Sequence, residues 1–191
     1  MSLPQRDPRQ ARAYPHDYGA VRIMLCCVSQ YPIRIYGDPV LKQPTQVVDD
    51  IDASVAKLAA DMIEVMYQAP GVGLAANQIG IAKRMFVYDI GTGAKVVINP
   101  EITETDGQWT YEEGCLSVPG LYWPIVRPKH VHLEGVDLDG NRISVEAEDL
   151  EARVFQHELD HLNGVLLIQR LDEDQLREAK RELRRIAVGR R

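Results

Sequence analysis

Residues 150–164 read LEARVFQHELDHLNG, and two histidines stand four positions apart in this stretch. On an α-helix, positions i and i+4 lie one turn apart on the same face, so the imidazoles of His157 and His161 can reach one cation. Glu158, beside the first histidine, can accept a proton from water bound to that cation. The pattern predicts a metal-binding helix that ends at Gly164, a residue suited to the left-handed conformation. The alternative is a surface helix with two unrelated histidines.

A catalytic tetrahedral site needs a third protein ligand and keeps its fourth position for water. A histidine at position 167 would complete the metzincin pattern, but this chain has Leu167. Glu178 and Glu182 are downstream glutamates, but both fall on the charged face of the last predicted helix, among arginines that would pair with them. Cys115 is a soft thiolate donor suited to Zn²⁺ or Fe²⁺.

The segment GVGLAANQ, residues 71–78, consists mainly of small and apolar residues. Its glycines would let the backbone approach a ligand closely. It lacks the Lys and Ser/Thr of a phosphate-binding loop. The alternative is a buried turn that enters a short helix. The side-chain amide of Gln78 could donate a hydrogen bond to an oxyanion.

Composition places the chain among ordinary globular proteins. It has 191 residues, of which 45% are hydrophobic and 26% are charged, and its net charge is −6. We therefore expect one compact domain without a broad nucleic-acid surface, hence no DNA partner. No apolar run is long enough to span a bilayer, so no membrane partner is expected. Three cysteines, an odd number, fit a reducing cytoplasm better than a disulfide framework.

The first 30 residues differ from the rest of the chain. They contain several arginines and three prolines, and Arg22 interrupts their short apolar patch. The patch is too short for a secretory signal and no small-residue cleavage site follows it. We predict a disordered or variable leader over 1–30 and a single domain over 31–191. Met24 is a hypothetical true start, and Cys26 and Cys27 are interpreted as incidental.

Hydrophobic periodicity predicts an amphipathic helix over 52–68 with Asp52 as its N-cap. A second helix covers 150–163, and a third begins near Asp172, where Gln175 could complete a capping box. Strands are expected at 85–90, 96–98, 102–105, 130–136 and 142–147, with turns at 91–93 and 139–140. Because strands and helices come in separate runs, the sequence predicts an α+β fold.

Three segments, in this order and unbroken, resemble the signature of the peptide deformylase family. They are GxGxAAxQ at 71–78, EGCLS at 113–117 and HExDH at 157–161. The stretch PIRIYGDPVL at 32–41 is also similar to the usual opening of that family, and the resemblance runs from 33 to 171. It implies mostly antiparallel sheets around a central HExDH helix, with a C-terminal helix.

The resemblance also implies the chemistry. Family members remove the N-formyl group from the N-terminal methionine of newly synthesised proteins and release formate. Cys115, His157 and His161 become the ligands of one divalent metal ion, Fe²⁺ in the cell, with Ni²⁺, Co²⁺ or Zn²⁺ able to replace it. Glu158 becomes the general base for a metal-bound water nucleophile. Gln78 and the backbone N–H of Leu116 become the donors that stabilise the oxyanion.

The expected substrates are N-formyl-methionyl nascent peptides. The backbone of Val72 and Gly114 would pair with the extended peptide, and glycine-rich backbone such as Gly73 would limit the site to a small acyl group. The methionine side chain would enter an apolar pocket with walls at Leu74, Leu116, Val118 and Val154. The basic face of the last helix suggests contact with the ribosome, and a solvated face is the alternative.

Three other functions compete with this one. A zinc peptidase that cleaves internal peptide bonds is disfavoured by Leu167 and by the two accompanying motifs. A structural metal site would have no use for Glu158 beside an open coordination position. An inactive relative is disfavoured because every motif position is intact.

The chain departs from the family pattern after Gly164. Members of the family usually have an aromatic residue followed by Asp-Arg there, whereas this chain has Leu-Ile-Gln-Arg at 167–170.

Overall fold

The computed structural model describes the backbone of residues 31–189 and the side chains of residues 31–186. The predicted leader 1–30, which contains Met24, Cys26 and Cys27, lies outside the described residues. The helices and strands, in chain order, are α1 Ala53–Gln68, β1 Gly73–Ala75, β2 Met85–Tyr88, β3 Lys95–Asp106, β4 Trp109–Cys115, β5 Val118–Arg127, β6 His130–Val136, β7 Arg142–Glu148, α2 Asp149–Leu162 and α3 Glu173–Gly189. Short 3₁₀ helices occupy Pro39–Lys42, Ala76–Ile79 and Leu167–Arg170.

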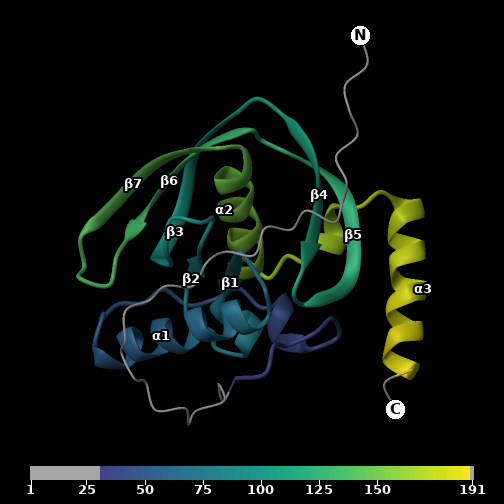
Figure 1. Ribbon diagram of the computed structural model, residues 1–191, viewed down its shortest axis with the longest axis horizontal. Coiled ribbons are helices and arrows are strands. Elements are labelled where there is room, and N and C mark those ends of the chain that lie inside the picture. The colour runs from purple at the N-terminus through teal and green to yellow at the C-terminus, as the bar shows by residue number, and fades with distance from the viewer. Residues whose placement is uncertain (1–30, 190–191) are drawn as a thin grey trace.

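The strands form two antiparallel sheets. Five strands pair in the order β1-β2-β3-β6-β7, and β4 and β5 form a separate hairpin. Figure 1 shows α2 in the middle of the molecule, with the larger sheet on one side and the hairpin on the other. The predicted α+β fold, with antiparallel sheets around the HExDH helix and a C-terminal helix, is confirmed.

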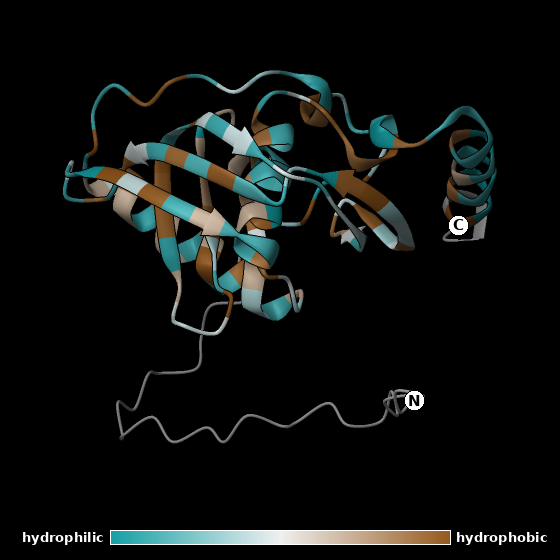
Figure 2. Cartoon of the chain, turned by 90° about the horizontal axis from the view of Figure 1, so that it is seen from above, coloured by the Kyte–Doolittle hydropathy of each residue, from teal (hydrophilic) through white to brown (hydrophobic). Residues whose placement is uncertain are grey.

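The larger sheet is packed on both faces at β2. All four residues of β2 are buried. Met85 and Val87 join the hydrophobic cluster of α1, whereas Phe86 and Tyr88 join the cluster of α2. Successive side chains of a strand point to opposite faces, so β2 connects the two clusters. The bands of hydrophobic and hydrophilic residues along the sheet are visible in Figure 2.

The helix limits agree closely with the prediction. Asp52 caps α1 by accepting hydrogen bonds from the backbone N–H groups of Ser54 and Val55. The expected capping box also forms before α3, because Asp172 Oδ1 accepts from Gln175 N at 2.8 Å and Gln175 Oε1 accepts from Asp172 N at 3.3 Å. The predicted helix 150–163 differs from α2 by one residue at each end.

The strands differ more from the prediction. The expected strands 96–98 and 102–105 are one strand, β3, with register shifts on either side of its middle. Asn99 has φ 51° and precedes Pro100, so a bulge interrupts the apolar pattern without ending the strand. The expected strand 85–90 ends at Tyr88, because Asp89 accepts backbone hydrogen bonds from the following turn.

The sequence pattern does not predict β1, β4 or β5. In the hairpin, three of the seven β4 residues and four of the ten β5 residues are exposed, and Pro119 and Pro124 interrupt β5. In β5 the exposed positions include the apolar residues Tyr122 and Val126, so its sequence lacks the alternation of polar and apolar residues that indicates a strand. Among residues 31–189, no helix is both long and apolar enough to cross a membrane.

Candidate metal centre and active site

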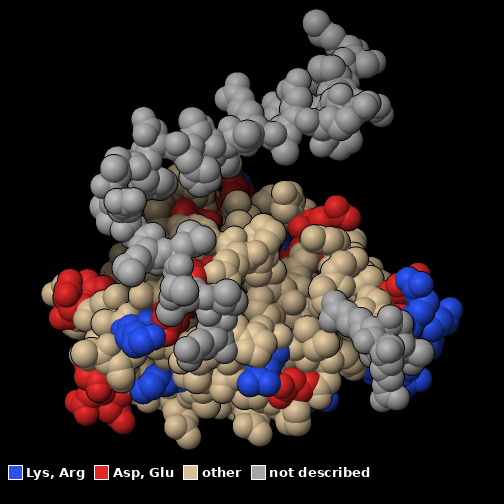
Figure 3. Space-filling model, turned by 60° about the horizontal axis from the view of Figure 1, so that its bottom comes forward, with Lys and Arg blue, Asp and Glu red and all other residues tan. Residues whose placement is uncertain are grey.

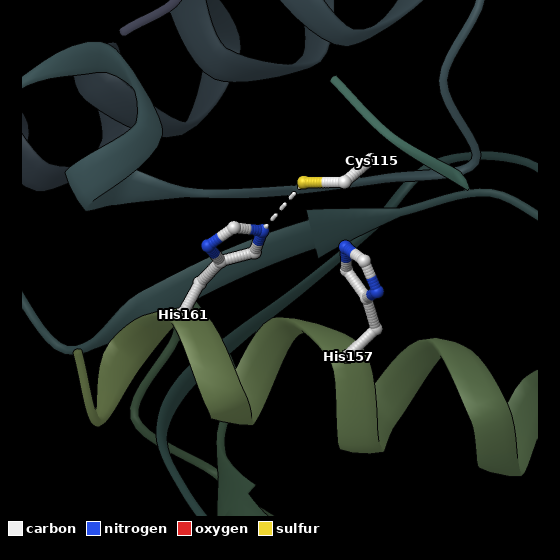
Figure 4. Close-up of side chains that lie close together, drawn as sticks. All are labelled: Cys115, His157 and His161. Atoms are coloured by element: carbon white, nitrogen blue, oxygen red, sulfur yellow. Dashed lines mark hydrogen bonds between the residues drawn. The ribbon is translucent and has the colours of Figure 1, made fainter. Parts of the chain in front are cut away.

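Three potential metal ligands meet between α2 and the end of β4. Figure 4 shows His157 and His161 rising from one face of α2 towards Cys115. Cys115 Sγ lies 3.2 Å from His161 Nε2, and donor atoms of all three residues lie within 4.8 Å of one another. The fold thus brings Cys115 next to two histidines that follow it in the sequence by 42 and 46 positions.

The hairpin aims the cysteine by a local irregularity. Gly114 pairs with Tyr122, but the next residue, Cys115, pairs with Val118, so the register shifts between them. A bulge of this kind redirects a side chain. A Cβ on Gly114 would lie 2.6 Å from Cδ1 of Tyr122, which explains why glycine precedes the cysteine.

Glu158 lies beside these residues in a buried position. Its side chain packs against Gly73 of β1, where an added Cβ would lie 2.9 Å from the Glu158 carboxyl carbon. Burial raises the pKa of Glu158 to about 7. Its Oε2 atom is buried and has no hydrogen-bond partner among the described residues. A buried carboxylate oxygen of this kind is available to a bound water or substrate.

Gln78 enters the site from the 3₁₀ helix after β1. Its Oε1 accepts a hydrogen bond from Ala75 N at 2.8 Å, which fixes which end of the amide faces the site. Its Nε2 donates to Ser117 Oγ at 3.2 Å and lies 4.0 Å from Cys115 Sγ. The amide N–H₂ group is therefore directed towards Cys115, one of the three potential ligands.

A layer of charged residues behind the ligands was not predicted from the sequence. Glu113 Oε1 lies 2.6 Å from His157 Nδ1, and Arg127 and Arg153 both donate to the Glu113 carboxylate. Burial acts to raise the pKa of Glu113, but hydrogen bonds from His157 and Arg127 outweigh it and hold that pKa well below its usual range. The available signal was the glutamate that opens EGCLS.

The two histidines differ in their electrostatic surroundings. Burial, and then the nearby His157, lower the pKa of His161 well below its usual value. Burial also acts to lower the pKa of His157, but hydrogen bonds with Cys115 and Glu113 raise it well above that value. Asn77, whose role was not predicted either, donates from Nδ2 to the His161 carbonyl at 2.5 Å and anchors the end of α2.

A pocket of about 390 Å³ opens in front of these groups. Of the residues predicted to bind substrate, the ones that line the pocket are Val72, Gly73, Gly114, Leu116 and Val154. Leu74 and Val118 are completely buried and do not line it. Leu74 packs in the cluster of α1, because alternate residues of β1 face opposite sides of the strand.

The residues present fit a divalent metal ion. One thiolate and two imidazoles form a donor set that suits Zn²⁺ or Fe²⁺, and three protein ligands leave a position for water. Glu113 holds the second nitrogen of His157, as carboxylates commonly do for metal-bound histidines. Glu158, whose Oε2 has no partner among the described residues, lines the same pocket as Cys115 and His157.

Comparison with known proteins gives a consistent result. The family model described as polypeptide deformylase matches residues 30–177. A peptide deformylase of Clostridium botulinum is 51% identical over 138 residues, which cover 72% of this chain and 94% of the relative. A peptide deformylase of Acidothermus cellulolyticus is 46% identical over 153 residues, covering 80% of this chain and 85% of the relative.

Solved structures resemble this fold at similar coverage. A peptide deformylase from Legionella pneumophila superposes with a TM-score of 0.80 at 37% identity, covering 84% of this chain and 96% of that one. A peptide deformylase from Synechococcus elongatus, in complex with actinonin, gives a TM-score of 0.78 at 38% identity, covering 82% and 89%.

Proposed function

Because the chain belongs to the polypeptide deformylase family and is a peptide deformylase, we propose that Cys115, His157 and His161 hold the metal ion of a reaction that removes the N-formyl group from nascent polypeptides. The proposed ion is Fe²⁺ in the cell, with Ni²⁺, Co²⁺ or Zn²⁺ able to occupy the same ligands. When bound, such a cation supplies Lewis acidity that lowers the pKa of water towards neutrality.

Glu158 is the proposed general base. It follows a metal ligand on α2, and its buried Oε2 has no other partner among the described residues, so it can accept a proton from the attacking water. The same carboxyl group then returns that proton to the departing α-amine, and formate leaves. Gly73 allows this approach, because a larger residue would occupy the space of the carboxylate.

Gln78 and the backbone N–H of Leu116 are the proposed donors to the oxyanion that develops on the formyl oxygen. The Gln78 amide is held by Ala75, so its N–H₂ group is oriented before the substrate arrives. Pre-oriented donors stabilise the transition state because they need no rearrangement as charge develops.

The substrate is proposed to bind as an extended strand between β1 and β4, both of which are edge strands. Val72 and Gly114 would supply backbone partners, and the methionine side chain would enter the pocket lined by Leu116 and Val154.

We take residues 31–191 as the single catalytic domain, acting in the cytoplasm. The basic face of α3 is the proposed contact with the ribosome.

The observation that carries the proposed mechanism is the convergence of five side chains, four of which line one pocket, while the fifth, His161, is buried beside Cys115. The potential ligands come from β4 and α2, the carboxylate from α2, and the amide from the segment after β1; the residues are Cys115, His157, His161, Glu158 and Gln78. Each of the three sequence motifs contributes at least one of them.

The decisive experiment measures formate release from a formyl-Met tripeptide by protein purified without oxygen and loaded with Fe²⁺ or Ni²⁺. We expect rapid release by the parent protein. Glu158→Gln should retain one metal per chain and lose at least about 100-fold in kcat, since general-base catalysis contributes ~10²–10⁴ in rate.

Glu151→Gln is the matched control. Glu151 also lies on α2, but its carboxylate contacts Tyr88 and Lys95 away from the pocket, so formate release should be unchanged. If the metal-loaded parent released no formate, the proposed mechanism would be overturned. Cleavage of internal peptide bonds by the same preparation would then indicate a zinc peptidase.

A further inference from the structure

A buried ionic network joins the hairpin that carries Cys115 to helix α2. Arg127 of β5 donates to Glu113 from Nε at 2.9 Å and from Nη2 at 2.7 Å. Its Nη1 donates to Asp160 of α2 at 2.9 Å. Asp160 also pairs with Arg170, outside the hairpin. Arg127 thus connects the carboxylate of β4 to the helix that carries both histidines.

Arg153 reaches the same carboxylate from α2 itself. Its Nη1 donates to Glu113 Oε2 at 2.7 Å, whereas His157 Nδ1 lies 2.6 Å from Glu113 Oε1. Arg153 and His157 are four residues apart, so they share one face of the helix. Arg153 and His157, one turn apart on α2, therefore each hold one oxygen of this carboxylate, and together with the two donors of Arg127 they fix its plane.

The Arg153 guanidinium is itself held firmly. Its Nη2 donates to the Trp109 carbonyl at 2.6 Å, and its Nη1 also donates to the Ile125 carbonyl at 3.2 Å. Its Cζ atom lies 4.9 Å from the centroid of the Trp109 ring. The Arg153 side chain is 4% exposed. A planar group with several fixed donors makes these contacts together, which the single ammonium group of lysine cannot reproduce.

We propose that Arg153 is a positioning residue for the metal centre. By holding Glu113 Oε2, it fixes the carboxylate that orients His157 through Oε1, and so it sets the direction of the His157 Nε2 lone pair. This inference rests on the ligand set of the proposed function. Residues that orient a metal ligand typically change metal affinity by ~10–100-fold when they are replaced.

The test compares metal affinity of the full-length parent with that of Arg153→Met. The dissociation constant for Ni²⁺ is measured by competition with a chromophoric chelator, and the absorption bands of the Co²⁺-loaded protein report ligand geometry. We expect Arg153→Met to bind Ni²⁺ about 10–100-fold more weakly and to show altered Co²⁺ bands. Circular dichroism establishes that the variant is folded.

Arg170→Met is the matched control. Arg170 belongs to the same network but contacts Asp160 and not Glu113. We expect its Ni²⁺ affinity to stay within about threefold of the parent, below the range typical of groups that orient a ligand. If the role of Arg153 were purely structural, both variants should show similarly small changes in Ni²⁺ affinity, because neither removes a metal ligand.

A folded Arg153→Met variant with the parent's Ni²⁺ affinity and Co²⁺ bands would overturn the positioning role. If that variant does not fold, Arg153→Lys decides. The lysine keeps a positive charge near Glu113 but cannot also donate to the Trp109 carbonyl, so the affinity for Ni²⁺ should fall by about tenfold. An affinity for Ni²⁺ equal to that of the parent would overturn the inference. A parent protein that binds no Ni²⁺ would overturn the ligand set of the proposed function, and with it this inference.

Discussion

At the scale of single residues, Gly73 determines how closely β1 approaches Glu158. An added Cβ would overlap the carboxylate, with the carboxyl carbon at 2.9 Å, but would meet no backbone atom as its nearest contacts. The end of a glutamate side chain can move without unfolding the protein. A substitution at this glycine should therefore displace the proposed base and leave the fold intact.

We expect Gly73→Ala to lower kcat for formate release by about 100-fold, since a catalytic group displaced by ~1 Å can cost that much. Metal content and thermal midpoint should stay close to those of the parent, because the ligands Cys115, His157 and His161 are not touched. Steady-state kinetics beside metal analysis measures both. Parent-like kcat would show that Glu158 does not need its present position.

At the scale of elements, α2 has one face for chemistry and another for the core. His157 and Glu158 line the pocket, whereas Phe155 is completely buried against β2. The Phe155 ring centroid lies 5.0 Å from that of Tyr88, edge to face, and 6.0 Å from that of Phe86. The helix is thus fixed to the larger sheet by aromatic packing.

Phe155→Ala should reduce the free energy of unfolding by about 3–5 kcal/mol, because it removes a large side chain from a close-packed core. Urea denaturation monitored by circular dichroism measures this loss. Leu150→Ala is the control on the same helix. Leu150 is 40% exposed, so its replacement should cost less than about 1 kcal/mol. Equal losses in the two variants would contradict the assigned packing.

At the scale of the whole molecule, the metal site joins two separately formed parts. Cys115 belongs to the two-stranded sheet, and both histidines belong to α2.

Charged side chains are unevenly distributed over the surface of the molecule. Figure 3 shows Lys and Arg side chains gathered at the edge where α3 lies, while acidic and basic groups are interspersed elsewhere on that face.

Removal of the metal should therefore lower the thermal midpoint of the whole chain. A ligand that binds only the folded state stabilises it by about 2.7 kcal/mol at 100 times its dissociation constant. Calorimetry of the Ni²⁺-loaded protein, before and after chelation, measures the shift. Cys115→Ser should reduce the shift, because it replaces the thiolate ligand. An unchanged midpoint after complete metal removal would contradict a cation that bridges the hairpin and α2.

Local patterns predicted much of this molecule. The helical repeat alone places His157 and His161, four positions apart, on one face of the helix. The caps at Asp52 and Asp172 involve residues two or three positions apart. Such features depend on interactions within one or two turns of chain, so the sequence by itself determined them. Together with the family motifs, they predicted the α+β class and the candidate ligands.

Only the tertiary structure decided which charges are buried together. Glu113 meets Arg153 from 40 positions away, and Arg127 meets Asp160 from 33 positions away. No local periodicity indicates such partners, because a charged side chain follows the same pattern whether it is solvated or buried with a counter-ion. The pocket walls are decided in the same way: β1 turns Leu74 into the core and leaves Gly73 against Glu158, because strand pairing sets which face each residue takes.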